Sequence, residues 1–294
     1  MGQQAQRTAR RRRLGAALKE LRESAGVTVA HAAAVICGDN SKVSRIETGR
    51  HCITTDELTT LLDLYKVGDT GIREWLRALG SEDRKQTWWR RYGELTPGFK
   101  ESLTLESEAA EISVYQTQVV PALLQTPEYA RVLMAGTLEP RPKETVDLYV
   151  DIRMKRQIIL RRENPPKYRC VMQEGVVRQQ IGGANVMAAQ LRRLVSEGQR
   201  PGVTIQIIPF SQTTFAGAGG SFYLYSYPEP MDFHVVQMSL LDGQRFLEDD
   251  DAVARGRRAF EALTASALSA DDSNVLMTSI ADKFEQERGA RDTP

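Results

Sequence analysis

The stretch from Thr28 to Arg50 constrains the fold of this chain most, because it predicts two short helices joined by a tight turn. Thr28 is a residue type that caps helices at their N-terminus, and the small residues after it allow two helices to pack closely. Asp39 is a second candidate cap, and Val43 and Ile46 follow it with the spacing of one helix face. The polar residues between them are left for the other faces of the second helix.

Two glycines delimit these helices. Gly38 interrupts the first helix, and Gly49 follows the second at the position where a left-handed residue commonly ends a helix. This pattern is typical of a helix-turn-helix, whose second helix enters the major groove of DNA with its N-terminal residues toward the base edges. The alternative is a helical hairpin that only packs against its own domain. Because the caps, the core spacing and the polar residues agree, they favour the DNA-binding interpretation.

The string SKVSRIETGR, residues 41–50, resembles the recognition helix and exit turn of the Xre/Cro-type regulators, in the form common among actinobacterial members. The resemblance implies that Glu47 braces the domain, whereas Asp39 and Asn40 replace the usual Ser and Pro of the family. Together with the residue chemistry, it gives the following candidate DNA-binding residues: Thr28, Asn40, Ser41, Lys42, Ser44, Arg45 and Arg50.

Among these candidates, Lys42 and Arg45 are expected to contact guanine or phosphate, because both side chains carry charged donors. The serines and the asparagine would add hydrogen bonds, and the first and last residues of the set would hold the DNA backbone. One such helix makes few base contacts by itself. We therefore expect a homodimer that reads two half-sites of double-stranded DNA about 34 Å apart.

Charge is distributed unevenly along the chain. Residues 1–50 hold ten Lys or Arg and four Asp or Glu, whereas the whole chain has a formal net charge of only +1. This asymmetry is typical of an N-terminal DNA-binding module on a separate regulatory body. The string TARRRR, residues 8–13, predicts a basic arm ahead of a first helix over residues 12–24. Such an arm either follows the DNA phosphates or a minor groove, or is a solvated tail.

A chain of 294 residues is too long for one helix-turn-helix domain, so a further domain is expected. Apolar spacing predicts five helices up to residue 80, the fourth with a capping box of Thr54 and Glu57 and the fifth with Ile72 turned inward. The expected organisation is a DNA-binding domain over residues 1–80, a linker over 81–87, a regulatory and dimerisation domain over 88–288, and a disordered tail over 289–294.

The second domain carries its own resemblance. The motifs WWRRYGELTPGF (88–99), VVPALLQTPEYAR (119–131), RMKRQIIL (153–160) and MQEGVVRQQIGG (172–183) are similar to the C-terminal domain called DUF5753, which is attached to Xre-type helix-turn-helices in actinobacteria. The resemblance covers roughly residues 86–270. Such regulators are also labelled antitoxin-like, which implies a small acidic or neutral partner protein encoded nearby.

The residues of this domain predict mixed structure. Candidate strands at 168–172 and 203–209 flank a candidate helix at 184–197, which suggests a parallel βαβ unit, and residues 221–227 and 233–240 predict a hairpin. Further helices are expected over 105–116, from Thr126 onward, and over 144–162, 250–270 and 273–288. The expected fold is therefore an all-α helix-turn-helix domain, lambda-repressor-like, followed by a larger α+β domain with a small mixed sheet and flanking helices.

Catalytic and metal-binding patterns are not found in the sequence. The three histidines are scattered and no GxSxG motif occurs, so an enzyme is the weakest class. Cys37, Cys52 and Cys170 have no paired spacing, so neither a disulfide framework, a metal site nor a cofactor is expected. Because no apolar run reaches membrane-spanning length and the N-terminus lacks an apolar segment, we expect a cytoplasmic protein.

Two hypotheses remain for the second domain. In the first it binds a small-molecule effector in a pocket formed by Trp88, Trp89 and Tyr92, with polar anchors from Arg153, Arg156, Gln157 and Glu174. In the second it is a dimerisation and protein-interaction platform for a small partner protein, and the tryptophan pair belongs to the core. The function expected is a sequence-specific transcriptional regulator; the alternative is an antitoxin-like module that mainly binds its partner and controls its own gene through DNA.

Overall fold

The computed structural model describes residues 8–81, 88–92, 95–136, 142–213, 219–241 and 243–291, of which 90–91 and 288–291 are described by their backbone alone. The chain folds into two compact units. Unit 1 comprises residues 1–108 and 225–253, and unit 2 comprises residues 109–224 and 254–294. Most of the expected linker over 81–87 and the last three residues of the expected tail lie outside the described residues.

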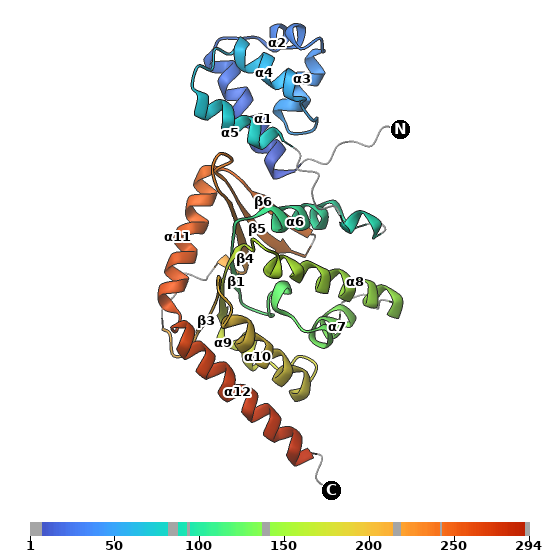
Figure 1. Ribbon diagram of the computed structural model, residues 1–294, viewed down its shortest axis with the longest axis vertical. Coiled ribbons are helices and arrows are strands. Elements are labelled where there is room, and N and C mark those ends of the chain that lie inside the picture. Colours follow the sequence, from blue (N-terminus) through green and yellow to red (C-terminus); the bar gives the residue numbers. More distant parts are fainter. Residues whose placement is uncertain are drawn as a thin grey trace. The chain divides into compact units, whose positions relative to one another are not determined.

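Five helices form a bundle in the N-terminal part of unit 1 (Figure 1): α1 (Ala9–Ser24), α2 (Val29–Val35), α3 (Asn40–Glu47), α4 (Thr55–Leu64) and α5 (Thr70–Gly80). Each begins after a residue whose side chain accepts a hydrogen bond from the first turn, and the fourth has the expected capping box. Leu18, Leu62 and Leu76 are fully buried and form the centre of the bundle. The expected all-α helix-turn-helix domain is confirmed.

Two expectations for this bundle are wrong. The first helix begins at Ala9 with Thr8 as its cap, so the basic residues from 10 to 13 form its first turn instead of an arm. Ile72 is 41% exposed, because Leu76 and Leu79 carry the buried face of α5.

The rest of unit 1 contains the 3-10 turn η1 (Trp88–Arg91), α6 (Pro97–Glu108) and the antiparallel pair β5 (Phe233–Leu240) and β6 (Gly243–Leu247). The hydroxyl of Tyr227 donates to the carbonyl of Leu105 over 2.6 Å, which holds α6 against the strands. The helix expected over 105–116 is wrong. It ends at Glu108, and the β-branched and aromatic residues that follow form a strand buried on both faces.

The strands in the described part of the chain form one six-stranded sheet with the order β3-β2-β1-β4-β5-β6. Unit 2 contains β1 (Glu111–Gln116), β2 (Lys167–Gln173) and β3 (Val203–Ile208), which are parallel, and the first half of β4 (Phe222–Tyr227). The expected parallel unit of β2, a helix and β3 is confirmed, and so is the α+β domain with a mixed sheet. β1 and β6 were not expected.

The helical elements of unit 2 are η2 (Ala122–Leu124), α7 (Pro127–Ala135), α8 (Lys143–Arg156), η3 (Gln157–Arg161), α9 (Glu174–Arg178), α10 (Ala184–Gly198), most of α11 (Asp250–Ser266) and α12 (Ala270–Arg291). Figure 1 shows α10 and α12 side by side, and Arg192 of α10 pairs with Asp282 and Glu285 of α12. Because α12 continues to Arg291, the tail expected from residue 289 is wrong for its first three residues.

Candidate nucleic-acid interface

The turn between α2 and α3 is built by local hydrogen bonds. The amide of Gly38 donates to the carbonyl of Ala33 over 2.9 Å, while Cys37 takes a left-handed conformation with φ of 51°. The Asp39 carboxylate then accepts from the amide of Lys42 over 2.6 Å and starts α3. The left-handed residue of the turn is therefore Cys37, one position before the glycine that marked it in the sequence.

The faces of α3 separate as the sequence predicts. Val43 and Ile46 are buried, with 1% and 3% of their surface exposed. The opposite side presents exposed polar residues, which are Asn40, Ser41, Ser44 and Arg45, and exposed Thr28 and Arg50 lie at the start of α2 and just after α3. Six of the seven candidate DNA-binding residues are thus exposed, and the seventh, Lys42, is half-buried.

Arg45 and Lys42 are in different situations. The side chain of Arg45 makes no hydrogen bond or ion pair with any residue that the structure describes, so its guanidinium donors are available to DNA. The ammonium of Lys42 instead pairs with Glu57, whose other oxygen accepts from the amide of Thr54 at the start of α4. A DNA contact by Lys42 has to share or replace that ion pair.

The electrostatics of Glu57 reflect this pairing. Burial acts to raise its pKa, but the hydrogen bonds from Lys42 and Thr54 outweigh burial and lower the pKa. The carboxylate of Glu57 is therefore charged at neutral pH, and its ion pair with Lys42 links α4 to α3.

A buried ion pair braces α3 against α1. Arg22 donates to the two carboxylate oxygens of Glu47 over 2.6 and 3.1 Å, and it also donates to the carbonyl of Val27 over 3.0 Å. Both charged side chains are less than one-tenth exposed. The bracing role that the family resemblance implies for Glu47 agrees with this geometry.

α1 and α3 also approach closely at a glycine. A Cβ on Gly15 would lie 2.6 Å from the carbonyl oxygen of Glu47 and closer still to that of Ile46. Only a residue without a side chain fits between the two backbones at this point. The sequence pattern gave no sign of this crossing.

Three arginines at the start of α1 form ion pairs within unit 1. Arg10 pairs with Glu108 over 2.8 Å, Arg12 with Glu248 over 2.5 Å, and Arg13 with Asp250 over 2.8 Å. These contacts correct the expectation of a DNA-following arm or a solvated tail. Their partners are 98 to 237 residues away in the sequence, so local pattern could not reveal them.

A further carboxylate meets the start of α1. Glu101 of α6 accepts from the backbone amide of Ala9 over 2.5 Å and lies 3.8 Å from the Arg12 guanidinium. Burial raises the pKa of Glu101 to about 7 despite these two favourable contacts. The contact between α6 and α1 is therefore sensitive to pH near neutrality.

The aromatic residues proposed for a ligand pocket form a compact cluster in unit 1. Trp88 lies edge-on to Trp89 and Tyr92, with ring centroids 5.7 and 5.6 Å away. Trp89 and Tyr92 are buried, which agrees with a role in the core.

The four polar residues proposed as anchors lie in unit 2. Arg153 donates to Gln125 over 2.6 Å, and Gln157 donates to the backbone of the η2 turn. Arg156 is buried in the last turn of α8, and Glu174 binds Arg178 and the amide of Phe210. These contacts give three of the polar residues structural roles, and a common site with the aromatic cluster stays a prediction.

The fold and the exposed face of α3 define a helix-turn-helix DNA-binding protein with an α+β C-terminal domain. Residues 13–75 match the family described as helix-turn-helix domain. Residues 99–279, more than half of the chain, match the family described as domain of unknown function, DUF5753, and the chain belongs to this family. Searches of the curated proteins and of the solved structures give no match. Among the described residues, every helix is too short or too polar to cross a membrane.

Proposed function

We propose that this chain is a sequence-specific transcriptional regulator that binds its operator as a homodimer, and that its C-terminal domain responds to a small molecule or a small partner protein. The observation that carries the proposal is the division of α3, whose apolar residues are buried while Asn40, Ser41, Ser44 and Arg45 are exposed together. Such a helix presents donors and acceptors to base edges in the major groove.

Arg45 is the main specificity residue in this proposal, because its guanidinium can donate two parallel hydrogen bonds to guanine. Lys42 has a secondary role, since its ammonium is paired with Glu57. The dimer follows from the small number of base edges that one short helix reaches, and it predicts an operator with two related half-sites about one helical turn apart.

The proposal is tested by selecting genomic fragments with the full-length chain at physiological salt. The Arg45→Ala variant is compared with Arg77→Ala, which removes an exposed arginine from α5 of the same bundle. Enrichment of palindromic fragments by the parent and the Arg77 variant, but not by the Arg45 variant, is expected. If the Arg45 variant enriches the same fragments as the parent, α3 is not the surface that reads the sequence.

The antitoxin-like alternative has one observation in its favour. Leu240, the last residue of β5, and Leu241, in the turn that follows, are 50% and 104% exposed, and exposed apolar surface of this kind can form a protein contact. Co-expression with each small protein encoded beside the gene tests it, using a Leu240→Ser, Leu241→Ser variant. A complex that forms with the parent and is lost in the variant would support the alternative.

A further inference from the structure

The parallel strands β1 and β2 of unit 2 end together at one edge of the sheet. β1 and β2 run side by side with Gln116 opposite Met172, so their carboxyl ends lie at the same edge of the sheet. From β1 the strand order continues to β2 and β3 on one side and to β4 on the other. The direction in which strands are added therefore reverses at β1. Ligands of open α/β sheets bind outside the carboxyl ends of the parallel strands, which is the edge that β1 and β2 share here.

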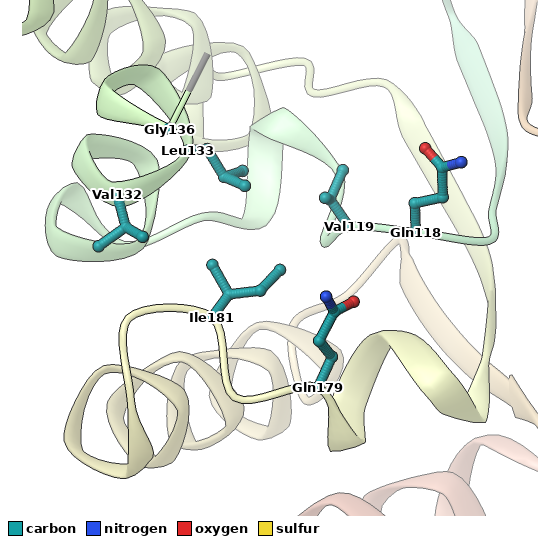
Figure 2. Close-up of a pocket in the computed structure, with 7 residues that line it drawn as sticks. All are labelled: Gln118, Val119, Val132, Leu133, Gly136, Gln179 and Ile181. Atoms are coloured by element: carbon teal, nitrogen blue, oxygen red, sulfur yellow. The ribbon is translucent and has the colours of Figure 1, made fainter. Parts of the chain in front are cut away.

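A cavity of about 460 Å³ lies among the segments that follow β1 and β2. Its walls come from the loop after β1, from the end of α7 and from the loop after α9, with the lining residues Gln118, Val119, Val132, Leu133, Gly136, Gln179 and Ile181. Figure 2 shows Gln118 and Gln179 on opposite walls toward one end of this space, with Val132 and Ile181 toward the other end. The volume falls in the range of small-molecule sites.

The wall after β1 is held in place by hydrogen bonds. The amide and the hydroxyl of Thr117 both lie 3.0 Å from the Ser221 hydroxyl. Directly after the lining residue Val119, the amide of Val120 donates to the Tyr129 hydroxyl over 3.2 Å, and its carbonyl accepts from the Gln125 side chain over 2.6 Å. Because this loop is anchored on both sides of Gln118 and Val119, the cavity is present without a ligand.

The opposite wall is fixed by a glycine. Gly182 has a φ of 77°, and a Cβ on it would lie 2.9 Å from a methyl group of Val132. This close approach sets the position of the neighbouring Ile181 against α7. Both walls are thus organised before any ligand enters, which reduces the entropy cost of binding.

Among the lining residues that the structure describes, none has an ionisable side chain. The polar side chains among these described residues are the primary amides of Gln118 and Gln179, and each of them can donate and accept a hydrogen bond. A charged ligand would find no partner of opposite charge among these described side chains. An amide or lactam group matches the two glutamines, because it also donates and accepts.

We propose that this cavity binds an uncharged small molecule whose aliphatic part contacts Val119, Val132 and Ile181 and whose amide-type group bonds Gln118 and Gln179. This inference specifies the site and the chemical class of the small molecule to which the C-terminal domain is proposed to respond, and it rests on that proposed function. Binding is measured without DNA, so failure of the cavity to bind and failure of α3 to read DNA are separate results.

The test uses the full-length chain with labelled isoleucine, leucine and valine methyl groups, and three probes of similar size. N-cyclohexylacetamide is neutral, cyclohexylacetate is anionic and 2-cyclohexylethylamine is cationic. The neutral amide is expected to shift the methyl signals of Val119, Val132 and Ile181 with a Kd of about 1 mM, which is typical of a probe this small. Anionic or cationic probes that shift them equally would overturn the assignment of an uncharged ligand.

Three variants locate the site. Ile181→Trp fills the cavity and should abolish the shifts, whereas Ile158→Trp places the same bulk on a residue of η3 that is 63% exposed and should leave them unchanged. Gln118→Leu, which retains the size of the side chain, should weaken the neutral amide about tenfold, the loss expected for one hydrogen bond. Absence of shifts in the parent, or shifts that survive Ile181→Trp, would refute the proposal.

Discussion

Gly15 gives the sharpest test of how α3 is positioned. In Gly15→Ala the added methyl group would lie 2.6 Å from the Glu47 carbonyl oxygen, well inside van der Waals contact, and the obstructing atoms are backbone. α1 must therefore move away from α3 by several tenths of an ångström. Leu14 and Leu18, which are 4% and 0% exposed on the same helix, would lose part of their packing.

The expected magnitude is a difference between two effects. Overpacking against backbone costs about 3 kcal/mol, at the upper end of the usual range. Alanine returns about 1 kcal/mol, because it favours a helix interior over glycine. The net loss of stability in the bundle should be about 2 kcal/mol, and operator affinity should fall because α3 is displaced.

Native-state hydrogen exchange on the full-length chain measures this loss, because it resolves the amides of α1 and α3 from those of unit 2. Gly71→Ala is the matched control, since its added methyl would meet only the Asp69 carboxylate, at 3.2 Å. Faster exchange in α1 and α3 of the Gly15 variant, with no comparable change in the control, is expected. A Gly15 variant that is as stable as the parent would show that the two helices do not cross as closely as described.

Three other perturbations act on the same bundle. Glu47→Gln leaves the buried Arg22 with only the exposed Glu23, 3.5 Å away, as a charged partner. The free energy of opening measured by exchange in α1 and α3 should fall by about 3 kcal/mol, whereas a loss below about 1 kcal/mol would mean that the pair behaves as an exposed one. Because the pKa of Glu101 is raised to about 7, the folded state binds the proton of this carboxyl group more tightly than the unfolded chain does. The stabilisation that this bound proton provides is complete below pH 4.5 and is lost as the pH rises through 7. Glu101→Gln should remove this decline, by up to about 3 kcal/mol, in thermal unfolding measured from pH 5 to 8, and an unchanged pH profile would contradict the raised pKa. Arg45→Ala should weaken specific operator binding by about 1 to 3 kcal/mol in a titration at fixed salt, and Lys42→Ala by less; the reverse order would show that the Glu57 pair opens on DNA.

The sequence predicts the parts of the fold that depend on neighbouring residues. Thr28, Asp39 and Thr54 each cap a helix where expected, and Thr126 does the same before Pro127. Capping is predictable because the acceptor and the amide it satisfies are two or three residues apart. The exposed face of α3 follows from the same helical spacing.

The missed elements depend on distant partners. β1 directly follows a helix, and its apolar residues continue the run of α6, so spacing alone did not separate the two elements. β6 is a short strand at the sheet edge with a partly polar sequence, and its pairing with β5 defines it. The described lining of the cavity in unit 2 is uncharged and comes from three separate segments, and no motif marks such a site.

The basic first turn of α1, which the sequence suggested was an arm, has the largest consequence for how the bundle is connected to the rest of unit 1. Arg10 and Arg12 join the start of α1 to carboxylates of α6 and of the segment after β6, while Gly15 and Arg22 of the same helix contact α3. A helix is stiff over this length, so a change in the charge of these carboxylates can displace the end of α3 through α1. Protonation of Glu101 is one such change, because it removes a negative charge beside Arg12. Within unit 1, α1 therefore provides a direct physical connection between the residues that follow the bundle and α3, the helix proposed to read DNA.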